Sequence, residues 1–181
     1  MRVIAGSAGG IRLLTVPGQA TRPSLDRVRE SVFAILTPRL QDALVLDLYA
    51  GTGALGLEAL SRGAASCVFV ESEEAALRVL RLNAERAGLA DRAKVLRGRL
   101  PKALDRLTGE SPFDLVLCDP PYAQAQWTAL LLALAPLLAD DFVVVWEHAR
   151  QDAPLLPQTY RLLRMTEYGQ TRVSFLGRGD V

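Results

Sequence analysis

Short apolar runs alternate with amphipathic stretches through the middle of the chain. Continuous apolar runs are typical of buried strands, whereas apolar residues that recur every three or four positions indicate helices. The expected strands are residues 43–48, 66–70, 94–96, 113–118 and 142–146. The expected helices are residues 54–62, 73–87, 101–107 and 127–138. This alternation predicts a parallel sheet with helices on both of its faces.

The N-terminal part of the chain departs from this alternation. Residues 2–5 and 11–14 flank a glycine-rich turn, so we expect a short N-terminal β-hairpin there. A helix is expected from Pro23, because apolar residues then recur at helical spacing, and Pro38 ends it. The hairpin and the helix would form a short extension in front of the sheet.

The C-terminal part is expected to complete the sheet. Residues 159–168 and 170–176 have the composition of two strands, and Gly169 between them favours a tight turn. They should pair as an antiparallel hairpin at the edge of the sheet. We therefore expect an α/β protein with a Rossmann-like, seven-stranded, mostly parallel sheet and a C-terminal antiparallel hairpin.

Length and composition narrow the class of protein. A chain of 181 residues is expected to form a single domain, residues 1–181. Cys67 and Cys118 both lie in apolar runs, which fits a reducing compartment better than a disulfide framework. The sequence contains no continuous apolar run of the roughly 18 residues that a transmembrane helix requires, and its start does not resemble a signal peptide. We expect a cytoplasmic protein with no membrane segment.

Positive charge is concentrated near the N-terminus, although the net charge of the chain is only +1. Residues 1–40 contain six arginines against Asp26 and Glu30, and acidic residues outnumber basic ones in the remainder. This asymmetry points to an anionic partner on the N-terminal side. A solvated arginine-rich face remains the alternative.

The sequence D-P-P-Y at residues 119–122 directly follows the expected strand 113–118. In an open α/β sheet, ligands bind at the carboxyl ends of the strands. Asp119 and the backbone carbonyl of Pro120 could accept both hydrogens of a planar amine, and Tyr122 could stack on its ring. Pro121 stiffens the turn and is expected to contact the substrate. We predict Asp119, Pro120 and Tyr122 as catalytic residues acting on a nucleobase amino group.

A glycine loop follows the first central strand. Residues 51–56 match G-x-G-x-x-G, and Glu71 ends the next expected strand 20 positions after Gly51. This arrangement can hold an adenosine, with the carboxylate on the ribose hydroxyls, and does not by itself distinguish a dinucleotide from S-adenosylmethionine. Asp47 at the head of the loop favours the latter, because a carboxylate would repel pyrophosphate but attract an ammonium group. The expected cofactor-binding residues here are Asp47, Ala50, Gly51, Thr52, Gly53, Glu71 and Ser72.

Several stretches together resemble the bacterial RsmD family of class I S-adenosylmethionine-dependent methyltransferases. These stretches are R-P-S-L-D-R-V-R-E-S-V-F at 22–33, D-L-Y-A-G-T-G-A-L-G-L-E-A-L-S-R-G-A at 47–64, F-V-E at 69–71 and Y-G-Q-T at 168–171. The resemblance covers nearly the whole chain. It implies methylation of the N2 amine of one guanine in 16S ribosomal RNA, the guanine-966 type of enzyme. It also implies S-adenosylmethionine as cofactor and no metal.

The resemblance also suggests how the chain is divided. Residues 1–40 would be an RNA-binding extension and residues 41–181 the catalytic core that binds S-adenosylmethionine. Phosphate contacts are expected from the arginines of the extension, and the partner would be 16S rRNA in the small ribosomal subunit or its precursor, bound by a monomer. The arginines concerned are Arg12, Arg22, Arg27 and Arg29.

One stretch departs from the pattern of many class I methyltransferases. Residues 97–100, after the third central strand, contain no acid to accept the adenine amine. The adenine contact is therefore assigned to backbone groups near Arg99 and Leu100. His148, the sole histidine, is expected in a loop or cap, because one histidine cannot build a usual zinc site.

Other functions remain open at this point. D-P-P-Y suits a DNA methyltransferase that modifies adenine N6 or cytosine N4 equally well, although 181 residues leave no room for a separate module to read a duplex. The glycine loop also suits a nucleotide-binding oxidoreductase. A non-catalytic RNA-binding protein is a third alternative, against which the intact Asp119 and Glu71 argue.

Overall fold

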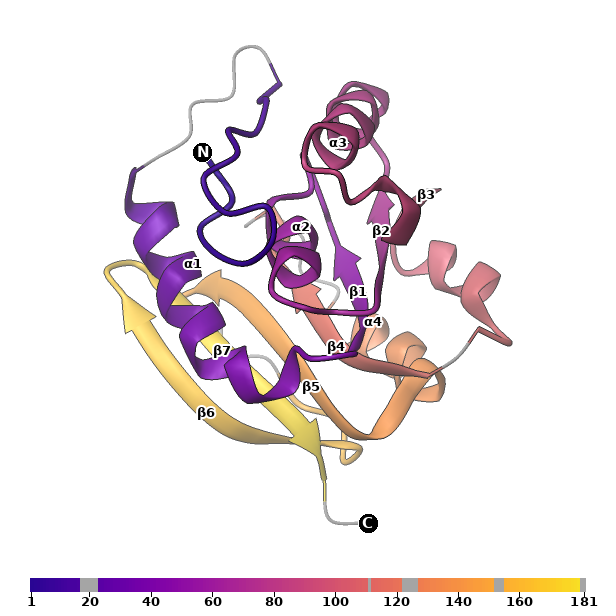
Figure 1. Cartoon of the computed structure of the whole chain (residues 1–181). Helices are drawn as coiled ribbons and strands as arrows, with labels where there is room; N and C mark the ends of the chain where they lie inside the picture. The colour runs from indigo at the N-terminus through magenta and orange to yellow at the C-terminus, as the bar shows by residue number, and fades with distance from the viewer. Residues whose placement is uncertain (17–22, 111, 122–126, 152–154, 180–181) are drawn as a thin grey trace.

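A seven-stranded sheet forms the centre of the computed structural model, which describes residues 1–16, 23–110, 112–121, 127–151 and 155–179 (Figure 1). The strand order is β3-β2-β1-β4-β5-β7-β6. The first five strands in this order are parallel, and β7 pairs antiparallel with both β5 and β6. The strands are β1 (Leu44–Leu48), β2 (Ser66–Glu71), β3 (Ala93–Arg97), β4 (Phe113–Cys118), β5 (Leu138–Ala149), β6 (Tyr160–Tyr168) and β7 (Thr171–Arg178).

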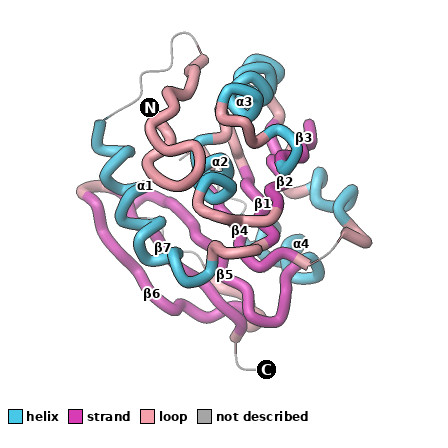
Figure 2. The backbone as a smooth tube through the Cα atoms, in the orientation of Figure 1, coloured by secondary structure: helices cyan, strands magenta, loops and turns pink. Residues whose placement is uncertain are grey.

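Helices cover both faces of this sheet (Figure 2). One face is covered by α1, α2 and α3, and the other by α4 and a 3₁₀ segment at Lys102–Leu107. None of the helices among the described residues is long and apolar enough to cross a membrane. The helices are α1 (Pro23–Leu36), α2 (Ala54–Ser61), α3 (Glu74–Arg86) and α4 (Trp127–Leu134), with further 3₁₀ turns at Thr37–Arg39, Ala90–Arg92 and Ala135–Leu137.

Alternation along the strands builds two hydrophobic cores. Val45 is fully buried on the face that packs against α1, α2 and α3, and its neighbour Leu46 is fully buried on the opposite face. Successive side chains of a strand point to opposite faces, so a strand that is apolar at every position contributes to both cores. This explains why the central strands appear in the sequence as continuous apolar runs.

The expected α/β class, the seven strands and the C-terminal hairpin are confirmed, and the largest shifts in boundaries are at one helix and one strand. The expected helix at 127–138 ends earlier, because Pro136 cannot continue an α-helix and the chain tightens into a 3₁₀ turn. β5 starts at Leu138 instead of residue 142. The acids Asp140 and Asp141 obscured this start, since they lie in the strand but face solvent and pair with Arg178 and Arg39.

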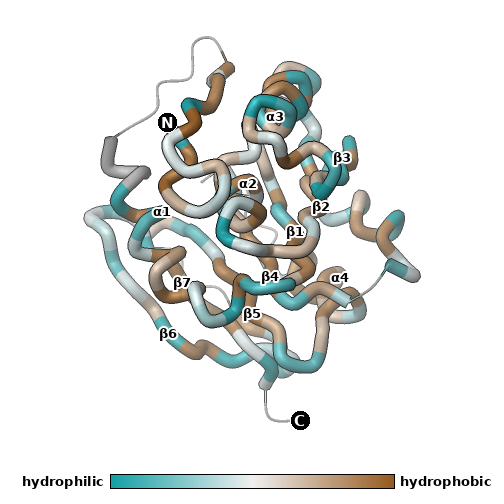
Figure 3. Tube along the Cα trace, viewed as in Figure 1, coloured by the Kyte–Doolittle hydropathy of each residue, from teal (hydrophilic) through white to brown (hydrophobic). Residues whose placement is uncertain are grey.

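The edge strand β6 is protected by charge. Leu162, Leu163 and Met165 are exposed by 50, 46 and 44% of their surface, and brown apolar positions interrupt the polar colours along β6 in Figure 3. Arg161 and Arg164 are interspersed with them. Charged residues on an edge strand oppose pairing with the edge of another chain.

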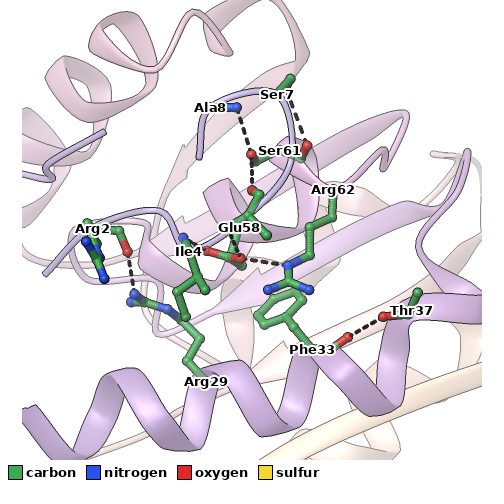
Figure 4. Close-up of polar contacts among 11 residues, drawn as sticks. Arg2, Ile4, Ser7, Ala8, Arg29, Phe33, Thr37, Glu58, Ser61 and Arg62 are labelled. Atoms are coloured by element: carbon green, nitrogen blue, oxygen red, sulfur yellow. Dashed lines mark hydrogen bonds and ion pairs between the residues drawn. The ribbon is translucent and has the colours of Figure 1, made fainter. Parts of the chain in front are cut away.

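The expected N-terminal β-hairpin is wrong. Residues 1–16 form a loop with one isolated antiparallel bridge, Arg2 to Arg12, and no strand. Backbone hydrogen bonds flank this bridge, from the amide of Val3 to the carbonyl of Ile11 at 3.0 Å and from the amide of Leu13 to the carbonyl of Met1 at 3.2 Å. The pairing does not extend into a ladder, because the next amides, those of Ile4 and Ala5, donate to the carboxylate of Glu58 at 2.6 and 3.1 Å (Figure 4). A side chain more than 50 positions away thus determines the local structure.

Glu58 anchors this N-terminal loop to α2. Its side chain is fully buried and also accepts a hydrogen bond from Nε of Arg62 at 2.6 Å. The next turn adds Ser61, whose hydroxyl accepts from the amide of Ala8 at 2.9 Å and donates to the carbonyl of Ala5 at 2.5 Å (Figure 4). A buried carboxylate is stable only when such donors compensate its lost hydration.

Replacing Glu58 with alanine should destabilise the protein by about 3 kcal/mol, because it leaves buried amides and Arg62 without their acceptor. Urea unfolding measures the change. The matched control is Glu85→Ala on the exposed side of α3, which should stay within about 0.5 kcal/mol of the parent. Equal stabilities of the two variants would contradict the anchoring role of Glu58.

Candidate active site

The segments that follow β1, β2, β3 and β4 meet at one edge of the sheet. The chain leaves β1 for β2 and β3 and then returns to pair β4 with the free side of β1, so the carboxyl ends of β1 and β4 flank a topological switch point. Open α/β sheets bind ligands in this crevice. A pocket of about 650 Å³ lies here. Its lining includes Tyr49 after β1, Glu71 to Glu73 after β2, Gly98 to Leu100 after β3, and Asp119 and Pro121 after β4.

Glu71 is held in a fixed orientation at this pocket. Its Oε2 accepts a hydrogen bond from the amide of Gly51 at 2.8 Å. Its Oε1 accepts from the amides of Ser72 and Glu73 at 2.7 and 2.9 Å. The carboxylate therefore connects the glycine loop after β1 with the end of β2. An ionised carboxylate has about four acceptor sites, and the fourth is contacted by the Ser72 hydroxyl, which donates to Oε1 over a long 3.5 Å.

The glycine loop, Ala50 to Gly53, lies beside the pocket and does not line it. Gly53 caps α2 with φ of 85°, a backbone angle that side-chain-bearing residues rarely adopt. The carbonyl of Thr52 accepts a hydrogen bond from Nδ2 of Asn83 at 2.9 Å, and the amide of Ala50 donates to the carbonyl of Val70 at 3.1 Å. The loop is thus fixed from α3 and β2.

Asp47 is buried under the loop residues and is 1% exposed. Its Oδ2 accepts a hydrogen bond from the amide of Gly56 at 2.8 Å. Burial raises the pKa of Asp47 to about 8, and the charges of Asp119 and Glu71 act in the same direction, whereas the Gly56 amide lowers it. Gly56 has to be glycine for a packing reason, since a Cβ there would lie 2.3 Å from a ring carbon of Phe69.

Asp119 forms a wall shared by two pockets. Besides the larger pocket it lines a second pocket of about 90 Å³. Solvent reaches the Asp119 side chain, but the surrounding protein displaces enough water to raise its pKa to about 6. At neutral pH the carboxylate is therefore mostly ionised and able to accept hydrogen bonds.

The smaller pocket has apolar walls and three ionisable groups. Its apolar lining includes Val28 and Val32 of α1 and Val145 and Val173 of the sheet. The ionisable groups are Asp119, Glu147 and Arg29. Burial, followed by the charge of Asp119, raises the pKa of Glu147 to about 8. This pocket can surround a flat apolar ring and offer carboxylates to its edge.

The structure separates the arginines that were expected to contact phosphate. Arg12 and Arg27 are exposed. Arg29 is 5% exposed, lines the smaller pocket and donates a hydrogen bond from Nη2 to the carbonyl of Arg2 (Figure 4). Its position thus differs from that of a surface phosphate contact. Arg22 and the catalytic candidate Tyr122 lie outside the described residues, and Pro120 is buried next to Asp119.

His148 lies inside β5 and not in a loop or cap, so that expectation is wrong. The ring is buried, with Nε2 2.9 Å from Oγ of Ser174 and Nδ1 3.0 Å from the carbonyl of Ala149. The strand extends three residues further than the apolar run, which explains the difference. Across the described ranges, no three His, Cys, Asp or Glu side chains are grouped to hold a metal ion.

Two lining residues, Tyr49 and Glu147, were missed in the sequence. Tyr49 adopts a φ of 56°, which is uncommon for a residue with a side chain and is frequent at functional sites. Both residues directly follow apolar strand positions, as Asp119 and Glu71 do. The rule that ligands bind at the carboxyl ends of strands was the signal available for Tyr49. Glu147 lies inside β5, so its place at the site follows only from the pairing of β5 with β4.

Comparisons with known sequences identify the family. A family profile described as "Conserved hypothetical protein 95" matches residues 1–177. The "Putative rRNA methyltransferase YlbH" of Bacillus subtilis is 38% identical over 180 residues, which cover 96% of this chain and 97% of YlbH. "Ribosomal RNA small subunit methyltransferase D" of Escherichia coli K12 is 34% identical over 173 residues, which cover 94% of this chain and 86% of that protein.

Solved structures show the same architecture. The "Putative methyltransferase yhhF from Escherichia coli" superposes with a TM-score of 0.86 at 32% identity, and the match covers 99% of this chain and 98% of that one. The structure of SMU.776, described as "a putative methyltransferase complexed with SAH", gives a TM-score of 0.70 at 12% identity, and the match covers 87% of this chain and 50% of that one. This second likeness concerns the fold alone.

The strand order and these structural matches define a class I methyltransferase fold. The chain belongs to the RsmD/YlbH family, as the resemblance in its sequence predicted.

The buried Asp47 should make stability depend on pH. Its pKa in the folded protein, about 8, exceeds the usual value of 3.8, so between these pH values the folded state retains a proton that the unfolded state releases. Stability should therefore fall as pH rises through this window. Asp47→Asn should make the decline shallower by up to about 1.4 kcal/mol per pH unit, the slope of one proton.

Urea unfolding of the ligand-free protein at several pH values between 5 and 9 measures this slope. Asp91→Asn, at an exposed acid after α3, is the matched control and should retain the parent slope. A slope that is unchanged in Asp47→Asn would show that Asp47 is ionised in the folded protein at neutral pH.

Proposed function

We propose that this chain transfers a methyl group from S-adenosylmethionine to the exocyclic N2 amine of one guanine in 16S ribosomal RNA. The observation that carries the proposal is the position of Asp119, which lines both the large pocket at the switch point and the small apolar pocket. A group in this position can contact the amine of a base in one pocket and face a methyl donor in the other.

The chemistry of the larger pocket fits S-adenosylmethionine. This ligand carries a sulfonium and an ammonium group, and the lining contains the carboxylates of Glu71, Glu73 and Asp119. A ribose hydroxyl could replace the long 3.5 Å contact that the Ser72 hydroxyl makes with Glu71. Backbone groups near Arg99 and Leu100 are available for the adenine. We propose that Asp47 supports the glycine loop and that five further residues surround this ligand: Ala50, Gly51, Thr52, Gly53 and Ser72.

Asp119 would act on the amine directly. When bound, S-adenosylmethionine supplies an activated methyl group: the amine nitrogen gains the methyl carbon, the carbon–sulfur bond breaks, and its electron pair stays on sulfur in S-adenosylhomocysteine. Asp119 and the carbonyl of Pro120 would accept the two N–H bonds of the amine and direct its lone pair. Positive charge that develops on the nitrogen is stabilised by the carboxylate, which then accepts the released proton or passes it to water. Pro121 and Tyr122 would position the base.

The family supports RNA as the substrate, because relatives over nearly the whole chain are named as rRNA methyltransferases. We propose that residues 1–40 contact the RNA and residues 41–181 perform the transfer. Arg12 and Arg27 are exposed, as phosphate contacts require, and Arg22 is proposed with them. Affinity for RNA should then fall as the salt concentration rises, and an affinity that does not change with salt would contradict these contacts.

The setting of the reaction follows from the same features. The two cysteines, Cys67 and Cys118, are buried and not paired with each other. This suits the reducing cytoplasm, where we propose that the protein acts as a monomer on the small ribosomal subunit or its precursor.

Mass spectrometry of nucleosides tests the proposed function directly. RNA and DNA are isolated from cells that lack the protein and from cells in which it has been restored. We expect one N2-methylguanosine of 16S rRNA to disappear and to return, and fragment mapping then identifies the guanine. Loss of methylated adenine or cytosine from DNA, with unchanged rRNA, would instead establish the DNA methyltransferase alternative.

Replacing Asp119 with alanine should lower the methylation rate by at least about 100-fold, because the developing charge on the amine loses its acceptor. The affinity for S-adenosylhomocysteine, measured by calorimetry, should remain within about tenfold of the parent, since Glu71 and the loops after β2 and β3 are unchanged. Asp114→Ala is no suitable control, because Asp114 accepts from the amide of Leu44. The exposed Asp91→Ala serves instead. Near-normal methylation by Asp119→Ala would refute the role of this carboxylate.

A further inference from the structure

Glu147 lies next to Asp119 across two paired strands. Asp119 follows Cys118 of β4 and Glu147 follows Trp146 of β5, and Cys118 and Trp146 are register partners in the parallel pair. The two residues therefore lie side by side on adjacent strands. Because side chains alternate along strands, both point to the face that α1 and α2 cover, and both line the smaller pocket.

These two carboxyl groups differ in their partners from the acids that the fold compensates. Glu58 and Glu71 each accept hydrogen bonds from backbone amides. Neither Asp119 nor Glu147 has a side-chain hydrogen bond or ion pair with any residue that the structure describes. Instead, burial and then the charge of Asp119 raise the pKa of Glu147. Two adjacent acceptors without donors are unfavourable, so a ligand that brings two adjacent N–H donors would relieve the cost.

The rest of the pocket suits the ring of such a ligand. Val28 and Val32 form an apolar wall on α1, and Val145 and Val173 form one on the sheet. The pocket volume of about 90 Å³ is several times the roughly 10–15 Å³ that a single water molecule requires. The edge of a base can therefore enter the pocket. Extruded bases are read by hydrogen bonds to their Watson–Crick edge while their faces contact apolar side chains.

Nucleobases differ in what lies beside their exocyclic amine. In guanine the N2 amine is adjacent to N1–H, so two donors lie side by side. In adenine the N6 amine is adjacent to N1, and in cytosine the N4 amine is adjacent to N3, and both of these ring nitrogens are acceptors. When Glu147 is ionised beside Asp119, it would attract the first edge and repel the other two. Because its pKa is raised to about 8, this form is favoured by a bound donor such as N1–H or by a pH above that value.

We propose that Glu147 accepts the N1–H of the guanine whose N2 amine Asp119 binds, and thereby selects guanine over adenine and cytosine. The inference rests on the proposed function and adds a specificity-determining residue to it. Donation by N1–H stabilises the ionised form of Glu147, so binding of guanine compensates for the unfavourable placement of its charge beside Asp119.

A base analogue tests this contact at the level of one atom. 2-Aminopurine retains the 2-amino group but has an unprotonated N1, which accepts a hydrogen bond. The mapped target nucleotide of 16S rRNA is prepared as guanosine or as 2-aminopurine riboside and offered to the parent protein and to Glu147→Gln. At about pH 9, where Glu147 with its pKa of about 8 is ionised, the parent should methylate guanine at least about 100-fold faster, because its carboxylate repels the acceptor N1 of the analogue.

In Glu147→Gln the preference should fall to within about tenfold, because a glutamine amide can either accept from N1–H or donate to N1. Glu85→Gln, at an exposed position of α3, should retain the parent preference. Relative affinities of the two RNAs, measured with S-adenosylhomocysteine present, should change in the same way and do not depend on turnover.

The outcomes separate this inference from the proposed function. A preference that is unchanged in Glu147→Gln, with guanine still methylated by the parent, would overturn the role of Glu147 alone. If Glu147→Gln does not fold, the parent still decides, because equal methylation of guanine and 2-aminopurine by the parent would overturn it as well. If the parent protein methylates no guanine, both the proposed function and the role of Glu147 are overturned.

Discussion

The site depends on the register of three parallel strands. Leu48 of β1 pairs with Cys118 of β4, and Cys118 pairs with Trp146 of β5. The residues that follow these three are Tyr49, Asp119 and Glu147, and they therefore emerge next to one another at one edge of the sheet. A shift of one residue in the register of any of these strands would turn the side chain that it contributes to the other face of the sheet, and the three side chains would no longer be neighbours. The two buried cores on either side of the sheet fix this register, since the shift would also reverse which apolar residues face which helices.

Several carboxyl groups near this edge are partly dehydrated, and they differ in the number of hydrogen bonds that compensate them. Glu71 is compensated by three backbone amides and holds the glycine loop against β2. Asp47 is compensated by one amide, and burial raises its pKa to about 8. Asp119 and Glu147 face the pockets, where a ligand can provide the donors. Acids with strongly shifted pKa values and exposed acceptor atoms are the ones suited to bind or to react.

Much of the sheet and part of the site could be predicted from the sequence, because both follow from local patterns. Continuous apolar runs located the central strands, and the strand-end rule located Glu71 and Asp119. The N-terminal hairpin failed because the amides of Ile4 and Ala5 are bound by Glu58, which no local pattern indicates. Arg29 was expected at the surface, but its direction depends on how α1 packs on the sheet. Glu147 was missed because its importance comes from the pairing of β5 with β4, which only the structure reveals.

The central claim is that Asp119 separates a pocket for the methyl donor from a pocket for the base. A crystal structure of the protein with S-adenosylhomocysteine tests it most directly. The account predicts that the adenosine lies between the segments that follow β2 and β3, with the sulfur at the end of the pocket that Asp119 lines. A ligand bound elsewhere, or one whose sulfur is directed away from Asp119, would contradict it.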